Sequence, residues 1–304
     1  MKRNTFLYIL VIGSLLFPHI SLCQGTEIGI SPVTFELTGN PGDTLTNQIK
    51  VYNPSEDTSV GIEMEVEDIA PSGEGGQVSA EVQESDTFSL MKWVEVEPKV
   101  FTLNPKSQEF VTFTINVPEN AEPGGHYGAV LAKTRTASGP EFTGATISHR
   151  VGSVVLLSVA GEVEENLVIS DFSAPQYSEY GPVPFSIRFE NQGTIHVKPR
   201  GLITITDWLG RKVADINVPE KNVLPGAVRK IEASWDTDWL LAGRYTATLH
   251  GSYGSANTFT PEVITFWGFS WKIGLMIVAV VAFFVLTRKR WSAAVRVLLK
   301  GEEK

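Results

Sequence analysis

The feature that most constrains the fold is a strict alternation of apolar and polar residues in several short segments. Residues 62–67 read Ile-Glu-Met-Glu-Val-Glu, and residues 111–117 read Val-Thr-Phe-Thr-Ile-Asn-Val. A period of two places successive side chains on opposite faces of a β-strand. Further segments of this kind are separated by clusters of Pro, Gly, Asn and Asp, and no long stretch of helical period precedes residue 266. The sequence therefore predicts an all-β fold before that point.

An internal repeat indicates how many domains the chain contains. Three patterns recur in the same order, at 49–53 and 187–191, at 103–105 and 224–226, and at 125–131 and 243–249. This predicts two tandem β-sandwich domains over 24–163 and 164–264. The spacing between the first two patterns is longer in the first copy, which predicts an insertion there near residues 71–86.

The third pattern, Gly-x-Tyr-x-Ala-x-Leu, indicates the type of sandwich. Tyr127 and Tyr245 occupy the position of the tyrosine corner of immunoglobulin-like domains, and Ala129 and Ala247 stand where antibody domains place a cysteine. We therefore predict two immunoglobulin-like sandwiches, in which both tyrosines have structural roles.

The amino-terminal segment predicts export. Lys2 and Arg3 precede an apolar run over 6–17, and residues 1–23 are typical of a signal peptide that ends at Cys23. A lipid on Cys23 is the alternative, but Leu22 stands where a lipoprotein signal requires a small residue. Because Cys23 is the single cysteine, a disulfide framework is excluded.

The carboxyl-terminal segment predicts an anchor. Residues 266–287 are mostly apolar and carry no charge apart from Lys272, and 22 residues of helix span about 33 Å, enough for a bilayer. A buried core helix is the alternative, but the basic run 288–290 follows at once. Residues 24–270 carry a net charge of −16 and residues 288–304 carry +4. We therefore predict a single transmembrane helix in the cell membrane, an extracellular amino-terminal part and a cytoplasmic tail over 288–304.

Composition and motifs exclude several functions. A net charge of −9 without a long basic run argues against binding to nucleic acid. No catalytic or nucleotide-binding motif is present, and the histidines lack metal-ligand spacing. Glu63, Glu65 and Glu67 could hold calcium, but the alternation explains them as the solvated face of a strand. The prediction is a protein that is not an enzyme and that has no catalytic residues, metal or cofactor.

Three residues are candidates for ligand binding. Trp93 could stack on a sugar ring or pack in the core, and His126 lies in a Pro-Gly-Gly-His run that is typical of an exposed loop. Trp208 lies in a hairpin-like turn in which Gly210 would take the positive φ.

The first domain resembles a known family. Residues 28–136 are similar to the N-terminal peptidoglycan-binding domain of WxL-interacting cell-surface proteins, and the order of segments along the chain also agrees. The residues that carry this resemblance are Ile30-Ser31-Pro32, Pro41-Gly42-Asp43-Thr44, Val51-Tyr52-Asn53, Leu103-Asn104-Pro105, Val117-Pro118 and Pro123-Gly124-Gly125-His126-Tyr127-Gly128. The chain also resembles, more distantly, the pilus-chaperone sandwich, which the predicted anchor argues against.

The family resemblance implies a function. It implies a membrane-anchored bacterial surface protein that binds peptidoglycan, a surface protein partner, or both. The alternative is a structural scaffold or receptor subunit that organises other envelope proteins without binding glycan.

Overall fold

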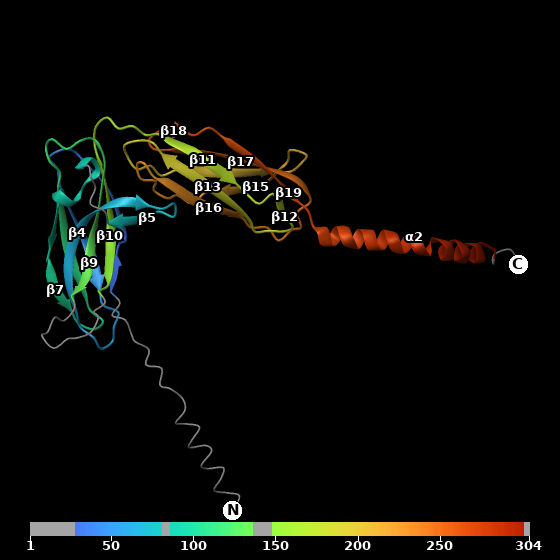
Figure 1. Ribbon diagram of the computed structural model, residues 1–304, viewed down its shortest axis with the longest axis horizontal. Coiled ribbons are helices and arrows are strands. Elements are labelled where there is room, and N and C mark those ends of the chain that lie inside the picture. Colours follow the sequence, from blue (N-terminus) through green and yellow to red (C-terminus); the bar gives the residue numbers. More distant parts are fainter. Residues whose placement is uncertain (1–27, 81–85, 136–147, 301–304) are drawn as a thin grey trace, which may run out of the picture.

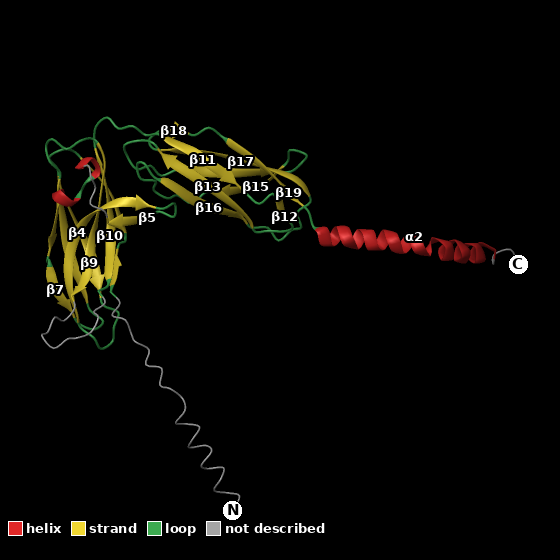
Figure 2. Cartoon of the chain, viewed as in Figure 1, coloured by secondary structure: helices red, strands yellow, loops and turns green. Residues whose placement is uncertain are grey.

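The strands of the first domain form two facing sheets (Figures 1 and 2). The computed structural model describes residues 28–80, 86–135 and 148–300, so the predicted signal peptide over 1–23 lies outside the described residues. The elements of this domain are β1 (Gly29–Ser31), β2 (Thr34–Gly39), β3 (Thr44–Tyr52), β4 (Val60–Ser72), β5 (Gln77–Ala80), the 3₁₀ helices η1 (Asp86–Phe88) and η2 (Met91–Trp93), β6 (Val94–Glu97), β7 (Val100–Leu103), β8 (Gln108–Asn116), β9 (Gly124–Arg135) and β10 (Arg150–Val159).

The amino-terminal strands of this domain contribute to both sheets. One sheet has the order β1-β3-β8-β6, and the other has the order β2-β10-β9-β4-β5 with β7 also paired to β4. β1 pairs antiparallel with β3, and β2 then pairs in parallel with the last strand, β10.

The second domain repeats this arrangement. Its sheets have the orders β11-β13-β16 and β12-β19-β17-β14-β15, with β18 also paired to β17. β11 pairs antiparallel with β13, and β12 pairs in parallel with the last strand, β19. The two immunoglobulin-like sandwiches are therefore as predicted. The strands are β11 (Leu167–Ser173), β12 (Tyr177–Ser178), β13 (Val183–Asn191), β14 (Arg200–Thr206), β15 (Lys212–Asn217), β16 (Val228–Trp235), β17 (Gly243–Tyr253), β18 (Asn257–Thr258) and β19 (Glu262–Gly268).

The alternation in the sequence explains how each sandwich packs. On β8, Val111, Phe113 and Ile115 are fully buried between the sheets of the first domain. In the second domain, Ala247 is fully buried at the position that antibody domains give to a cysteine, and Phe185 packs edge to face on Phe266 at a centroid distance of 5.9 Å. Burial of apolar side chains from both sheets stabilises each sandwich.

The insertion in the first domain links it to the second. Residues 69–80 form the β4–β5 hairpin, which Figure 1 shows extending from the first domain towards the second. Its turn residue Glu74 accepts a hydrogen bond from Arg188 Nε at 2.7 Å, and its carbonyl accepts one from the Lys230 amide at 2.7 Å. Tyr127 and Leu156 of the first domain also pack into the core cluster of the second. The hairpin and this shared core hold the two domains together.

The final helix, α2 (Trp271–Lys300), begins later than predicted. Phe266 is a residue of β19, only 1% exposed, and its ring stacks on Tyr245 at 5.4 Å. The predicted start of the membrane span at Phe266 is therefore wrong, because this aromatic side chain belongs to the core of the second sandwich. In the part of the chain that the structure describes, no helix combines the length and hydropathy that crossing a bilayer requires.

Candidate functional site

The structure brings two of the predicted binding residues together. Trp93 ends η2 and His126 lies on β9, and their ring centroids are 4.2 Å apart with the planes inclined by 43°. Trp93 is partly buried against the core of the first domain. The indole therefore packs on the core, as one interpretation predicts, and it also lines a surface cavity, while stacking on a sugar ring stays a prediction.

A carboxylate holds the chain before Trp93 in place. Asp68 Oδ1 accepts hydrogen bonds from the amides of Leu90 and Met91 at 2.9 and 2.8 Å, and Oδ2 accepts one from the Ser89 hydroxyl at 2.7 Å. Asp68 lies on β4, so these bonds fasten the start of η2 to the sheet and fix where Trp93 can lie.

His126 is not the exposed loop residue that we predicted. It is 2% exposed, because β9 begins at Gly124 and the Pro-Gly-Gly run opens a strand. Gly124 has a φ of +131°, which favours glycine there. His126 Nε2 lies 3.0 Å from the carbonyl oxygen of Glu122, and Nδ1 lies 3.2 Å from that of Ser89. The imidazole therefore ties two loops together beneath the indole.

The cavity beside this ring pair has a volume of about 290 Å³. One wall is aromatic, and the rest offers hydroxyl, amide, ammonium and carboxylate groups. That mixture suits a small polar ligand with an apolar face, such as a single sugar ring. Its lining residues are Thr87, Ser89, Lys92, Trp93, Pro118, Asn120, Ala121, Glu122 and His126. The polar residues of this lining could not be predicted from the sequence, because residues 87–93 and 118–126 come together only in the folded chain.

Trp208 lies elsewhere, as the exposed tip that the sequence predicted. It is 66% exposed in the turn between β14 and β15, where Gly210 has a φ of +76°. Asp207 Oδ1 accepts hydrogen bonds from the amides of Leu209 and Arg211, both at 2.9 Å. The indole lines a separate cavity of about 630 Å³ with Arg244 and Trp267.

The two predicted corner tyrosines differ. The Tyr245 hydroxyl accepts a hydrogen bond from the amide of Ala242 at 3.4 Å, which resembles a corner bond. The corner prediction is wrong for Tyr127, whose hydroxyl accepts a hydrogen bond from the His196 amide of the other domain at 2.8 Å. Its oxygen also lies 3.3 Å from His196 Nδ1. Burial raises the pKa of Tyr127 well above its usual range, so the hydroxyl keeps its proton.

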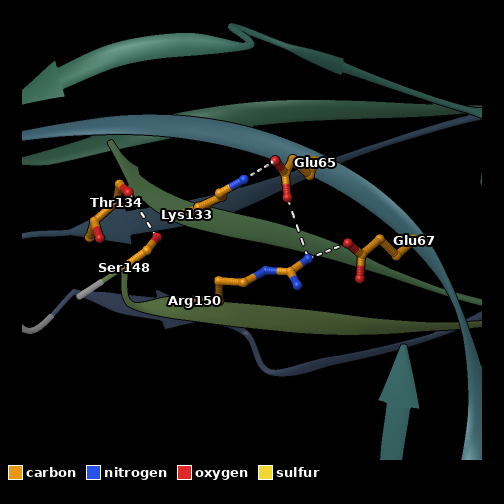
Figure 3. A network of polar contacts seen from close by, with 6 residues as sticks. All are labelled: Glu65, Glu67, Lys133, Thr134, Ser148 and Arg150. Atoms are coloured by element: carbon orange, nitrogen blue, oxygen red, sulfur yellow. Dashed lines mark hydrogen bonds and ion pairs between the residues drawn. The ribbon is translucent and has the colours of Figure 1, made fainter. Parts of the chain in front are cut away.

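The acidic face of β4 pairs with cations of the same sheet (Figure 3). Glu65 lies 2.8 Å from Lys133 Nζ and 3.3 Å from Arg150, and Arg150 also bonds to Glu67. Among the described residues, no three His, Cys, Asp or Glu side chains gather as metal ligands. This face is the solvated side of a strand, as the alternation indicates.

Comparisons with known proteins show a similarity of structure only. No protein-family model matches the chain, and no curated protein matches it in sequence. A chain of the chaperone–tip adhesin complex of CFA/I fimbriae biogenesis is 12% identical, with a TM-score of 0.40 over 78% of this chain and 98% of that one. The class 5 fimbriae chaperone CfaA is 14% identical, with a TM-score of 0.39 over 80% and 100%. The E. coli chaperone DraB is 11% identical, with a TM-score of 0.37 over 79% and 96%. A similarity at these sequence identities and TM-scores supports no conclusion about family, ligand or partner. The resemblance to WxL-interacting proteins therefore stays a prediction.

Proposed function

We propose that this chain is a non-enzymatic, membrane-anchored binding protein of the bacterial cell surface, and that its first domain binds peptidoglycan. The observation that carries the proposal is the cavity beside Trp93 and His126. An indole face next to Asn120, Glu122 and Lys92 offers a sugar ring both an apolar contact and hydrogen-bonding groups.

Helix α2 supports the anchorage. Ten large apolar side chains between Leu275 and Leu286 are exposed. Successive residues of a helix advance by about 100°, so these side chains cover every face of it. Burying one such side chain contributes about 1.5 to 3 kcal/mol, which favours a lipid surrounding over water. The charges of −16 before the helix and +4 after residue 287 support an extracellular amino-terminal part.

Binding is tested by sedimenting purified peptidoglycan sacculi with the protein and two matched variants. We expect Trp93→Phe to weaken binding, because a smaller ring covers less of the sugar while still packing on the core. Trp208→Phe makes the same change in the second domain and should leave binding unaltered. Asn120→Ala, at an exposed cavity residue, should weaken binding without touching the core. Binding lost only with Trp208→Phe would contradict the proposal.

Anchorage is tested on intact cells. Protease added outside should degrade residues 24–265 and spare the tail after residue 287. A protected amino-terminal part would contradict the proposed orientation.

One observation favours the scaffold alternative. Tyr52 and Phe110 are exposed on the outer face of the first domain's four-stranded sheet, and aromatic side chains are enriched in protein interfaces. If no form of the protein sediments with sacculi, and Phe110→Ser abolishes cross-linking to other envelope proteins, the scaffold function is favoured instead.

A further inference from the structure

The end of the second domain from which α2 leaves carries exposed aromatic and apolar side chains from four separate chain segments. These segments are the β14–β15 turn, the loop between β16 and β17, the chain around β12, and the junction of β19 with α2. We call the set the aromatic collar, and its members are Tyr177, Tyr180, Trp208, Leu209, Trp239, Leu240, Trp267, Phe269 and Trp271.

Strand register places the four segments at one end of the sandwich. Thr206, which precedes the β14–β15 turn, pairs with Thr246 near the start of β17. Trp267 pairs with Arg244 on one side and with Tyr177 on the other. A bridge joins Tyr180 to Leu240. Figure 1 shows α2 leaving the domain at this end, beside β12 and β19.

The side chains of the collar stay exposed although the same domain buries other large aromatic side chains in its core. Trp239 is 82% exposed, whereas Trp235, four residues earlier, is buried in the core. Four of the seven tryptophans of the chain belong to the collar. Trp and Tyr are enriched where a protein meets the boundary between lipid and water, because one end of each side chain is apolar and the other is polar.

Two ion pairs lie beside the collar. Arg211 lies 2.7 Å from Asp207, whose side chain is 8% exposed, and Lys272 lies 3.3 Å from Glu179. Pairing lowers the cost of bringing these charges close to a region of low dielectric constant. The collar is also continuous with the exposed apolar surface of α2, which begins at Trp271.

We propose that the aromatic collar lies in the headgroup region of the bilayer that holds α2, so that the second domain stands on the membrane surface. This inference rests on the proposed anchorage through α2. It adds that the folded domain itself binds the lipid surface, through loops that are distant from the helix in sequence.

The test uses the full chain in phosphatidylcholine vesicles, in a Cys23→Ser background with single cysteines that carry an environment-sensitive fluorophore. Trp239→Cys and Leu209→Cys probe the collar. Ala256→Cys is the control, because it is an exposed residue in the turn after β17, at the other end of the domain. Val281→Cys reports on the helix. We expect a blue shift and a loss of iodide quenching at 209, 239 and 281, but not at 256.

The outcomes separate this inference from the anchorage. If 281 is shielded while 209 and 239 behave like 256, the collar inference is wrong and the anchor stands. If 281 is also quenched by iodide, the anchorage itself fails.

A second measurement avoids the added dye. Brominated acyl chains should quench less fluorescence in Trp239→Phe than in the parent chain, whereas Trp93→Phe should leave the quenched amount unchanged. Collar positions that are shielded from iodide but not quenched by brominated lipid would mean that protein covers them, which also overturns the proposal.

Discussion

Removing one oxygen atom, by Tyr127→Phe, should loosen the junction between the two domains. The hydroxyl accepts a hydrogen bond from the His196 amide at 2.8 Å, and Tyr127 is 3% exposed. Phenylalanine fills the same space but leaves that partly buried amide without its partner. An unsatisfied buried donor costs about 1 to 3 kcal/mol. We expect the free energy of unfolding of a two-domain fragment, residues 24–268, to fall by that amount.

Urea unfolding followed by fluorescence measures this loss, and two comparisons make it specific. Tyr245→Phe removes a 3.4 Å bond at an exposed amide, so its cost should stay below about 0.5 kcal/mol. In a fragment of the first domain alone, residues 24–163, Tyr127→Phe should cost almost nothing, because His196 is absent. An equal loss in both fragments would refute the reasoning, since the hydroxyl would then act within the first domain. No loss in either would mean that the bond between the domains contributes no stability.

The remaining predictions concern the domain junction and the second core. Burial holds the pKa of His196 below its usual 6.5, so the unfolded chain takes up the proton first as the pH falls. The free energy of unfolding should therefore decrease as the pH drops from 6.5 through the lowered value. A flat pH profile would contradict this. Lys198→Met removes the 2.7 Å ion pair with Glu36 and should cost less than about 1 kcal/mol in urea unfolding at neutral pH, because the pair is partly exposed. The hydrogen bond from Lys198 holds the pKa of Glu36 below 4.5, so this difference should vanish as the pH falls through the lowered value, and a difference that persists in acid would count against the pair. Phe185→Ala should cost about 3 to 5 kcal/mol, because the ring is fully buried, whereas the exposed Phe110→Ala should cost less than about 0.5; similar losses would place the core elsewhere.

Local pattern was enough to predict the strands. The alternating residues of 62–67 and 111–117 lie on β4 and β8, and the Asp207 turn forms around Gly210 as expected. These features depend on neighbours along the chain. The period of two predicts the strands directly, and Gly210 predicts the turn. The repeat of three short patterns also predicts two similar sandwiches, because each copy of the repeat forms its own pair of sheets.

Contacts between residues distant in sequence could not be predicted in this way. Tyr127 meets His196 across 69 positions, and nothing near either residue signals the pairing. Pro-Gly-Gly usually marks a loop and so predicts one around His126, yet pairing of Gly124 with Val159 makes this segment a strand. The apolar run that begins at Phe266 predicts the start of a membrane span, yet this residue lies on the core-facing side of strand β19.

The parallel pairing of β2 with β10 affects the order in which the first domain can be assembled. Ser153 donates a hydrogen bond to the carbonyl of Pro32, 121 positions earlier in the chain. During synthesis β2 therefore emerges long before β10, its one sheet neighbour among the described residues, and stays unpaired until β10 follows. Pairing over such a separation is slow because the loop must first be closed. A nascent chain stopped before residue 150 would present open backbone edges on both β2 and β9, ready to pair with another chain.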